Sequence, residues 1–228
     1  MNLPDAALWL ITSPSKMIDF HTHILPCIDD GSKSLEMSLE MLRREAEQGI
    51  SAVIFTPHFY AHQNSPEKFL ERRNNAFKKV MAVLPAGMPE LHLGAEVQYF
   101  DGICQVENLN RLCVDGGRHL LLEMPFSKWS HQVVQDALEL QSRDSIQVTL
   151  AHIERYFDFA EKDMWEALRS NGVQMQCNAT FFLNWKTRHK AIKMYKDGFI
   201  DLLGSDCHNL TTRPPNLAEA IPYIEKYL

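Results

Sequence analysis

The sequence has few of the features that mark secreted, redox-active or membrane proteins. It contains five cysteines, an odd number, and no two of them form a Cys-x-x-Cys pair. Neither a disulfide framework nor a thiolate zinc or redox site is therefore expected, and a reducing, cytoplasmic location is predicted. No stretch of about 18 apolar residues occurs either, so we expect no membrane insertion.

An excess of positive charge is also absent. The chain has 23 lysines and arginines against 29 aspartates and glutamates, which gives a formal net charge of −6. Surfaces that hold nucleic acid are usually basic, so we expect no nucleic-acid partner, and a nuclease is disfavoured. An anionic substrate would have to be met by a few basic groups at one place.

The length of 228 residues suits one α/β domain. The apolar run Ala6 to Ile11 has no basic flank before it and is shorter than the core of a usual signal peptide. We therefore expect residues 1–16 to be an N-terminal extension or arm and residues 17–228 to form a single domain.

Apolar runs of strand length alternate with helical patterns, the order expected of a parallel sheet covered by helices. The predicted strands are Met17 to Phe20, Ser51 to Thr56, Leu91 to Ala95, His119 to Leu122, Ile146 to Ala151, Val173 to Cys177 and Ile200 to Gly204. Helices are predicted over Leu35 to Ala46, Glu67 to Val83, Trp129 to Gln141, Lys162 to Ser170, Thr187 to Tyr195 and Leu217 to Tyr227. This order favours an α/β barrel.

Side chains that can bind metal ions follow the C-terminal ends of nearly all these strands, where barrel enzymes build their sites. Two of them lie two residues apart, a spacing that points both imidazoles to the same side of an extended chain. Asn178, after the sixth strand, is a candidate to support a ligand. The predicted ligands are His21, His23, Asp30, His58, Glu96, Glu123, His152, Asp206 and His208.

The predicted ligands are imidazoles and carboxylates without thiolate, which favours manganese, iron or zinc over magnesium or calcium. Their number is too large for one ion and predicts two or three. The four carboxylates carry a total charge of roughly −4, so three divalent ions would leave the site with a net charge of about +2 before hydroxide binds. Such a site would attract a phosphate dianion.

Two arginines adjoin the predicted ligands. Arg155 lies three residues after His152, and Arg213 lies five residues after His208. Because the planar guanidinium group matches the paired oxygens of a phosphoryl group, we expect both arginines to bind substrate phosphate.

The segment Cys207 to Arg213 also satisfies the Cys-(x)5-Arg spacing of thiol-based tyrosine phosphatases. Those enzymes use a low-pKa thiolate in a loop whose backbone N–H groups cradle phosphate. This segment contains no glycine, and Pro214 and Pro215 remove amide donors where a phosphate-binding helix would begin. We therefore reject thiol chemistry in favour of metal chemistry.

The stretches MIDFHTHILPCIDDG, TPHFY, LGAEV, LLEMPF, AHIERY and GSDCHNLTTRPP resemble the polymerase-and-histidinol-phosphatase (PHP) superfamily. More narrowly, they resemble its bacterial tyrosine-protein phosphatase branch of the CpsB and YwqE type. The resemblance runs from Met17 to the C-terminus. Cys27 and Cys207 depart from the branch, but no ligand position is missing.

The resemblance implies a distorted (β/α)7 barrel resembling the TIM barrel and a centre of two or three divalent ions, manganese before iron or zinc. It also implies hydrolysis of phosphotyrosine on a cognate bacterial tyrosine kinase of polysaccharide export, which would regulate capsular and exopolysaccharide synthesis. The same nine residues would be the ligands, and Arg155 and Arg213 would bind phosphate. Oligomers are compatible with this assignment.

The expected mechanism is in-line attack on phosphorus by a metal-bridging hydroxide, with the arginines holding the non-bridging oxygens. A small-molecule phosphatase of the same superfamily, such as one acting on histidinol phosphate, would use the same chemistry. A rival of another class is a non-catalytic partner-binding module that keeps the metals for stability. The complete ligand set and both arginines favour the enzyme.

Overall fold

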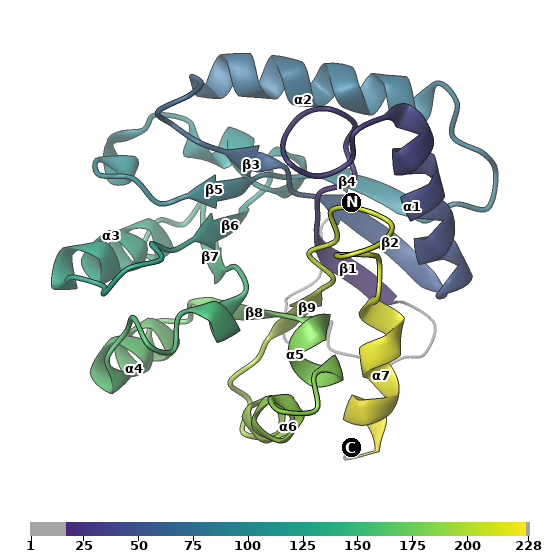
Figure 1. Cartoon of the computed structure of the whole chain (residues 1–228). Coiled ribbons are helices and arrows are strands. Elements are labelled where there is room, and N and C mark those ends of the chain that lie inside the picture. The colour runs from purple at the N-terminus through teal and green to yellow at the C-terminus, as the bar shows by residue number, and fades with distance from the viewer. Residues whose placement is uncertain (1–16, 227–228) are drawn as a thin grey trace.

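The computed structural model describes residues 17–226 (Figure 1), so the expected N-terminal arm lies outside the described residues. All paired strands run parallel, in two sheets of order β1-β2-β4 and β3-β5-β6-β7-β8-β9. The strands are β1 Met17–Thr22, β2 Ile50–Phe55, β3 His58–Phe59, β4 Glu90–Leu93, β5 Glu96–Gln98, β6 His119–Glu123, β7 Gln147–Leu150, β8 Gln174–Asn178 and β9 Leu202–Gly204.

Two of the predicted strands are each followed, after a break of two residues, by a further short strand that lies in the other sheet. The predicted second strand continues past Pro57, which has no N–H to donate, into β3. The predicted third strand corresponds to β4, which ends before Gly94, and the chain then continues into β5. Backbone hydrogen bonds span both breaks, from Gly94 N to Phe55 O at 2.8 Å and from Glu96 N to Pro57 O at 3.1 Å. Glu96 therefore begins a strand, where the sequence placed it after one.

The sheets curl until the first strand meets the end of the last (Figure 1). The amide of His23 donates to the carbonyl of Cys207 at 2.9 Å, and the amide of Asp206 donates to the carbonyl of His21 at 2.8 Å. Gly204 permits this approach, because a Cβ there would lie 2.6 Å from Cβ of His21. The fold is a single α/β domain with a curled parallel sheet.

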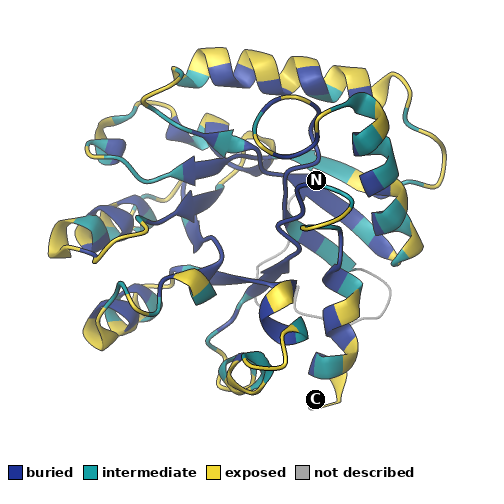
Figure 2. Cartoon of the chain, viewed as in Figure 1, coloured by how far each residue is buried: buried dark blue, intermediate teal, exposed yellow. Residues whose placement is uncertain are grey.

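Helices lie outside the curled sheet and expose their outer faces (Figure 2). Serine N-caps begin three of them: Ser34, Ser65 and Ser130 accept backbone N–H groups in the first turns of α1, α2 and α3. The helices are α1 Leu35–Glu47, α2 Pro66–Met81, α3 His131–Gln141, α4 Lys162–Ser170, α5 Ala179–Leu183, α6 Arg188–Lys196 and α7 Leu217–Glu225. None in residues 17–226 is long and apolar enough to cross a membrane.

Two connections differ from the predicted alternation. The five-residue helix α5 follows β8 directly, and it is too short for the sequence pattern to reveal. Between β5 and β6 the chain forms three 3-10 turns, η2 Ile103–Gln105, η3 Leu109–Leu112 and η4 Val114–Gly116. Left-handed backbone at Asn108 and Asp115 interrupts this segment and prevents a continuous helix.

Candidate metal centre

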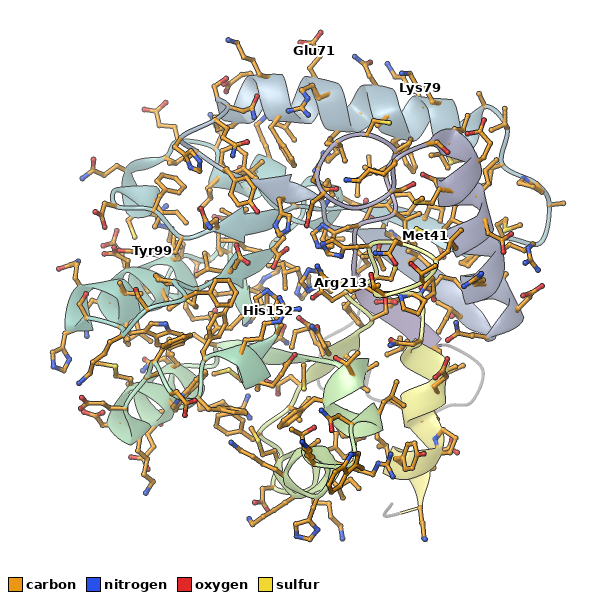
Figure 3. All side chains as sticks on the ribbon, viewed as in Figure 1. Met41, Glu71, Lys79, Tyr99, His152 and Arg213 are labelled. Carbon is orange, nitrogen blue, oxygen red and sulfur yellow. The ribbon has the colours of Figure 1, made fainter. Side chains whose placement is uncertain are left out.

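The structure brings the nine predicted ligands together at the centre of the curled sheet. Figure 3 shows His152 and Arg213 pointing toward this centre from different segments of the chain. Several ligands lie at strand termini, namely His58 and Glu96 at the starts of β3 and β5, and Glu123 at the end of β6. His21 lies inside β1, which runs two residues further than predicted. The side chains form three overlapping groups.

The first group joins β1 to the segment after β9. The Nε2 atoms of His21 and His23 lie 3.1 Å apart. Each lies 3.2 Å from Oε2 of Glu96. Oδ1 of Asp206 is 3.6 Å from Nε2 of His21 and 3.5 Å from Nε2 of His23. Two imidazole nitrogens and two carboxylate oxygens therefore face one point.

The second group is centred on the carboxylate of Glu96. Its Oε1 lies 2.8 Å from Nε2 of His152, and its Oε2 lies 2.9 Å from Nδ1 of His58. Oε1 of Glu123 is 3.6 Å from Nε2 of His152. Glu96 is thus shared between the first and second groups.

The third group lies nearer to solvent. Oδ1 of Asp30 is 3.5 Å from Nε2 of His58 and 3.4 Å from Nε2 of His208. The side chain of Asp30 is 65% exposed, whereas His208 is 3% exposed. This group therefore forms the outer edge of the cluster.

These residues fit divalent cations. Buried atoms of the cluster make no hydrogen bond in the structure, among them Oε2 of Glu96, Nδ1 of His58 and Nε2 of His208, although each faces other nitrogen or oxygen atoms. Ligands bound at about 2.1 Å from a cation lie roughly 3.0–3.5 Å from one another, close to the separations seen here. Cations among them would satisfy these atoms.

The electrostatics of the cluster indicate competition between cations and protons. Burial alone would lower the pKa of His23, but Asp29 and Glu96 raise it to about 10. Burial opposes the charge on His152 too, yet hydrogen bonds with Glu123 and Glu96 raise its pKa to about 9. Burial and the neighbouring His23 instead lower the pKa of His208 to about 4. Cations would have to displace protons from His23 and His152.

Two supporting residues were missed by the sequence reasoning. Oδ2 of Asp29 lies 2.8 Å from Nδ1 of His23 and accepts the amide of His58 at 3.1 Å. Oε1 of Gln176 lies 3.1 Å from Nδ1 of His21 and accepts the amide of His152 at 2.7 Å. Such partners fix ring orientation and tautomer.

The sequence held some signal for these supporting contacts. Asp29 stood beside Asp30 in the Asp-Asp-Gly motif, and Gln176 lies two residues before Asn178 on one face of β8. Asn178 itself donates to Oδ2 of Asp206 at 2.9 Å, consistent with the supporting role predicted for it.

The backbone of the site is also constrained. His152 and Asp206 adopt φ values of 31° and 54°, in the left-handed region that non-glycine residues seldom enter. Glycine is required at position 31, next to His23, because a Cβ there would lie 2.1 Å from the carbonyl oxygen of His23. Unfavourable backbone conformations of this kind concentrate at functional sites.

Both arginines converge on Asp206. Arg155 contacts Oδ2 of Asp206, and Nη2 of Arg213 lies 2.6 Å from the same oxygen. Each arginine side chain is 37% exposed, while that of Asp206 is 3% exposed. The guanidinium groups are therefore held at the cluster and remain accessible to an anion.

Cys207 is unsuited to act as a nucleophile. It is fully buried, and burial raises the pKa of its thiol well above the ordinary value, with Glu45 and Asp19 adding to the effect. Its Sγ faces the Glu45 carboxyl at 3.9 Å. The structure thus supports the rejection of thiolate chemistry.

The loop after Cys207 forms no phosphate cradle. The amides of His208 and Asn209 donate to the carbonyl of Arg213. The side-chain oxygen of Asn209 accepts the amides of Thr211, Thr212 and Arg213 at 2.9, 2.8 and 3.1 Å. These amides are committed within the loop, which instead fixes the position of Arg213.

Two carboxyl groups lie buried behind the cluster. Oδ1 of Asp19, in β1, accepts the amides of His21 at 3.2 Å and Ser205 at 2.9 Å. Glu45 approaches from α1, and burial followed by the charge of Asp19 raises its pKa well above the ordinary value. Oδ2 of Asp19 and Oε2 of Glu45 make no hydrogen bond. Through these two amides, Asp19 links β1 to Ser205, the residue that follows β9.

Comparison with known proteins identifies the family. The family described as "Capsular polysaccharide synthesis, CpsB/CapC" matches residues 17–228. The chain belongs to the CpsB/CapC family. A curated relative, tyrosine-protein phosphatase YwqE of Bacillus subtilis (strain 168), is 28% identical over 219 residues, covering 92% of this chain and 84% of YwqE.

A second relative is tyrosine-protein phosphatase CpsB of Streptococcus agalactiae serotype III (strain NEM316), 27% identical over 91% of this chain and 89% of that protein. Among solved structures, those of YwqE from Bacillus subtilis and CpsB from Streptococcus pneumoniae are described as unique metal-dependent tyrosine phosphatases. The match has a TM-score of 0.78 at 24% identity and covers 93% of this chain and 87% of the other. This CpsB/CapC chain therefore shares their fold.

Proposed function

We propose that this CpsB/CapC protein is a metal-dependent protein-tyrosine phosphatase. Its substrate would be phosphotyrosine on a cognate bacterial tyrosine kinase of polysaccharide export, so that it regulates capsular and exopolysaccharide synthesis. The observation that carries the proposal is the convergence of Arg155 and Arg213 on Asp206, itself part of a buried histidine and carboxylate cluster. The relatives' names as tyrosine-protein phosphatases support the substrate class.

The proposed ligands are the nine residues of the cluster, which would hold two or three divalent ions. Manganese is favoured, with iron and zinc as alternatives, because the donors are imidazole nitrogens and carboxylate oxygens without a thiolate. When bound, such ions supply Lewis acidity toward the phosphoryl oxygens and a hydroxide nucleophile at neutral pH.

The chain's own residues would bind and orient the substrate. Arg155 and Arg213 would take the non-bridging oxygens of the phosphoryl group, exchanging their contact with Asp206 for contact with the substrate. Asp29 and Gln176 would keep His23 and His21 in the orientations that ligation requires. The buried walls would exclude bulk water from the inner part of the site.

We also propose the full architecture and location. The bridge between Thr22 and Cys207 supports a closed, distorted (β/α)7 barrel built from both sheets. The free cysteines among the described residues support a reducing cytoplasm.

The test is turnover of a phosphotyrosine peptide from a polysaccharide-export kinase, compared with histidinol phosphate. We expect activity on the peptide to disappear with a chelator, to return with Mn²⁺, and to survive Cys207→Ala. Faster turnover of histidinol phosphate would favour the small-molecule enzyme instead. A metal-loaded protein inactive on every phosphomonoester would refute catalysis.

A further inference from the structure

An exposed aromatic side chain lies at the edge of the metal centre. Large apolar side chains that are exposed among residues 17–226 are Met81, Val83, Phe126 and Trp185. Phe126 is 50% exposed and stacks on the ring of His152, with ring centroids 5.8 Å apart and an interplanar angle of 24°. An apolar ring that remains half in water beside a polar cluster is well placed to contact a ligand.

Phe126 packs against a buried aromatic pair, Tyr156 and Trp129. Its ring lies 5.3 Å from that of the fully buried Tyr156, which in turn lies 5.5 Å from Trp129. The hydroxyl of Tyr156 accepts a hydrogen bond from the amide of Met124 at 3.1 Å, which fixes the Tyr156 side chain to the segment just after β6. The position of Phe126 is therefore set before any ligand arrives.

A second aromatic ring adjoins the cluster at another histidine. Tyr60 stacks on His58, with centroids 5.1 Å apart and an interplanar angle of 19°. The carboxylate of Glu96 contacts His58 through Oε2 and His152 through Oε1. Phe126 and Tyr60 thus each cover an imidazole that meets Glu96, one from the segment after β6 and one from the segment after β3.

We propose that Phe126 and Tyr60 form an aryl-binding wall that recognises the phenyl ring of phosphotyrosine, with Phe126 as the main specificity-determining residue. This inference rests on the proposed function. A single ester oxygen separates phosphorus from the ring, so a phosphoryl group held by Arg155 and Arg213 places the ring at the rim of the cluster. An aromatic ligand can stack there, whereas the alkyl chain of phosphoserine cannot.

The test compares benzylphosphonate with methylphosphonate, which carry the same anionic head and differ in the ring; the methylene group of benzylphosphonate replaces the ester oxygen between phosphorus and the ring. Binding to the Mn²⁺-loaded protein is measured by calorimetry for the wild type, Phe126→Leu and the conservative Phe126→Trp. We expect Phe126→Leu to reduce the preference for benzylphosphonate by about three- to tenfold. Phe126→Trp should preserve the preference, and Tyr60→Leu should lower it in the same direction.

Two controls separate recognition from structural damage. The metal content of Phe126→Leu and its affinity for inorganic phosphate should equal those of the wild type. In turnover, the variant should lose kcat/KM on a phosphotyrosine peptide through KM and change less than about twofold on a phosphoserine peptide. Equal losses on both phosphonates, or an unchanged preference, would overturn the inference.

The binding test of the aryl-binding wall can succeed or fail independently of the activity test of the proposed function. Wild-type protein that binds benzylphosphonate preferentially but leaves phosphotyrosine intact would refute the proposed function, while the binding ratios would still support the wall. Turnover of phosphotyrosine with no effect of Phe126→Leu on the phosphonate ratio would refute the wall alone.

Discussion

Replacing Glu45 by glutamine should make the protein more stable at neutral pH. Glu45 is fully buried in α1 beside Asp19, and its Oε2 makes no hydrogen bond. Burial and the charge of Asp19 raise the pKa of Glu45 well above its ordinary value, so the folded chain holds a proton that the unfolded chain releases. Glutamine has nearly the same shape and carries no charge at any pH.

The magnitude follows from proton linkage. A raised pKa in the folded state means that the stability of the wild type is greatest below the unfolded pKa, about 4.3, and falls as the pH rises toward the folded pKa. The loss is about 1.4 kcal/mol for each pH unit and each proton. Between pH 5.5 and 7, Glu45→Gln should therefore gain up to about 2 kcal/mol relative to the wild type.

The assay is urea unfolding at several pH values. A chelator is present throughout, because ligands that lose a cation take up protons, and this would add a pH dependence of its own. Glu47→Gln is the matched control, since Glu47 lies on the same helix with its side chain 58% exposed. A stability difference between Glu45→Gln and wild type that stays constant across this pH range would show that Glu45 takes up no extra proton on folding and would refute the reasoning.

Three further predictions concern the centre. Arg213→Ala should weaken the affinity for inorganic phosphate by about ten- to a hundredfold while bound metal stays constant; a parallel loss of metal would contradict a substrate-binding role. Asp29→Asn should lower Mn²⁺ affinity by about ten- to a hundredfold, measured by indicator competition, because it loses the carboxylate facing His23; unchanged affinity would refute that role. Apparent Mn²⁺ affinity should rise from pH 6 to 8, by up to about tenfold per unit for each displaced proton, because the pKa values of His23 and His152 are about 10 and 9; a flat titration would contradict this.

The sequence could predict much of the fold because parallel strands buried on both faces read as apolar runs. It also indicated which side chains would meet, since the C-terminal ends of such strands share one edge. It could not show that, after breaks at Pro57 and Gly94, the chain continues from the second and third predicted strands into short strands of the other sheet. Those breaks depend on hydrogen bonds between segments far apart in the chain, which no local pattern encodes.

The supporting contacts were harder to predict for the same reason. Asp29 and Gln176 are short polar residues whose role depends on which imidazole lies opposite, and that partner is set by the register of other strands. The buried pairing of Asp19 with Glu45 joins a strand and a helix that are unrelated in pattern. Phe126 was indistinguishable in sequence from a core residue, because its half exposure arises only from the fold.

The position of Asp206 has a consequence for the order in which the centre assembles. Its Oδ1 faces the imidazoles of His21 and His23, and its Oδ2 is engaged by both arginines. If Asp206 also ligated a cation, its attraction for the guanidinium groups would weaken, and Arg155 and Arg213 would become available to an incoming anion. Asp206 would thereby favour metal loading before substrate binding.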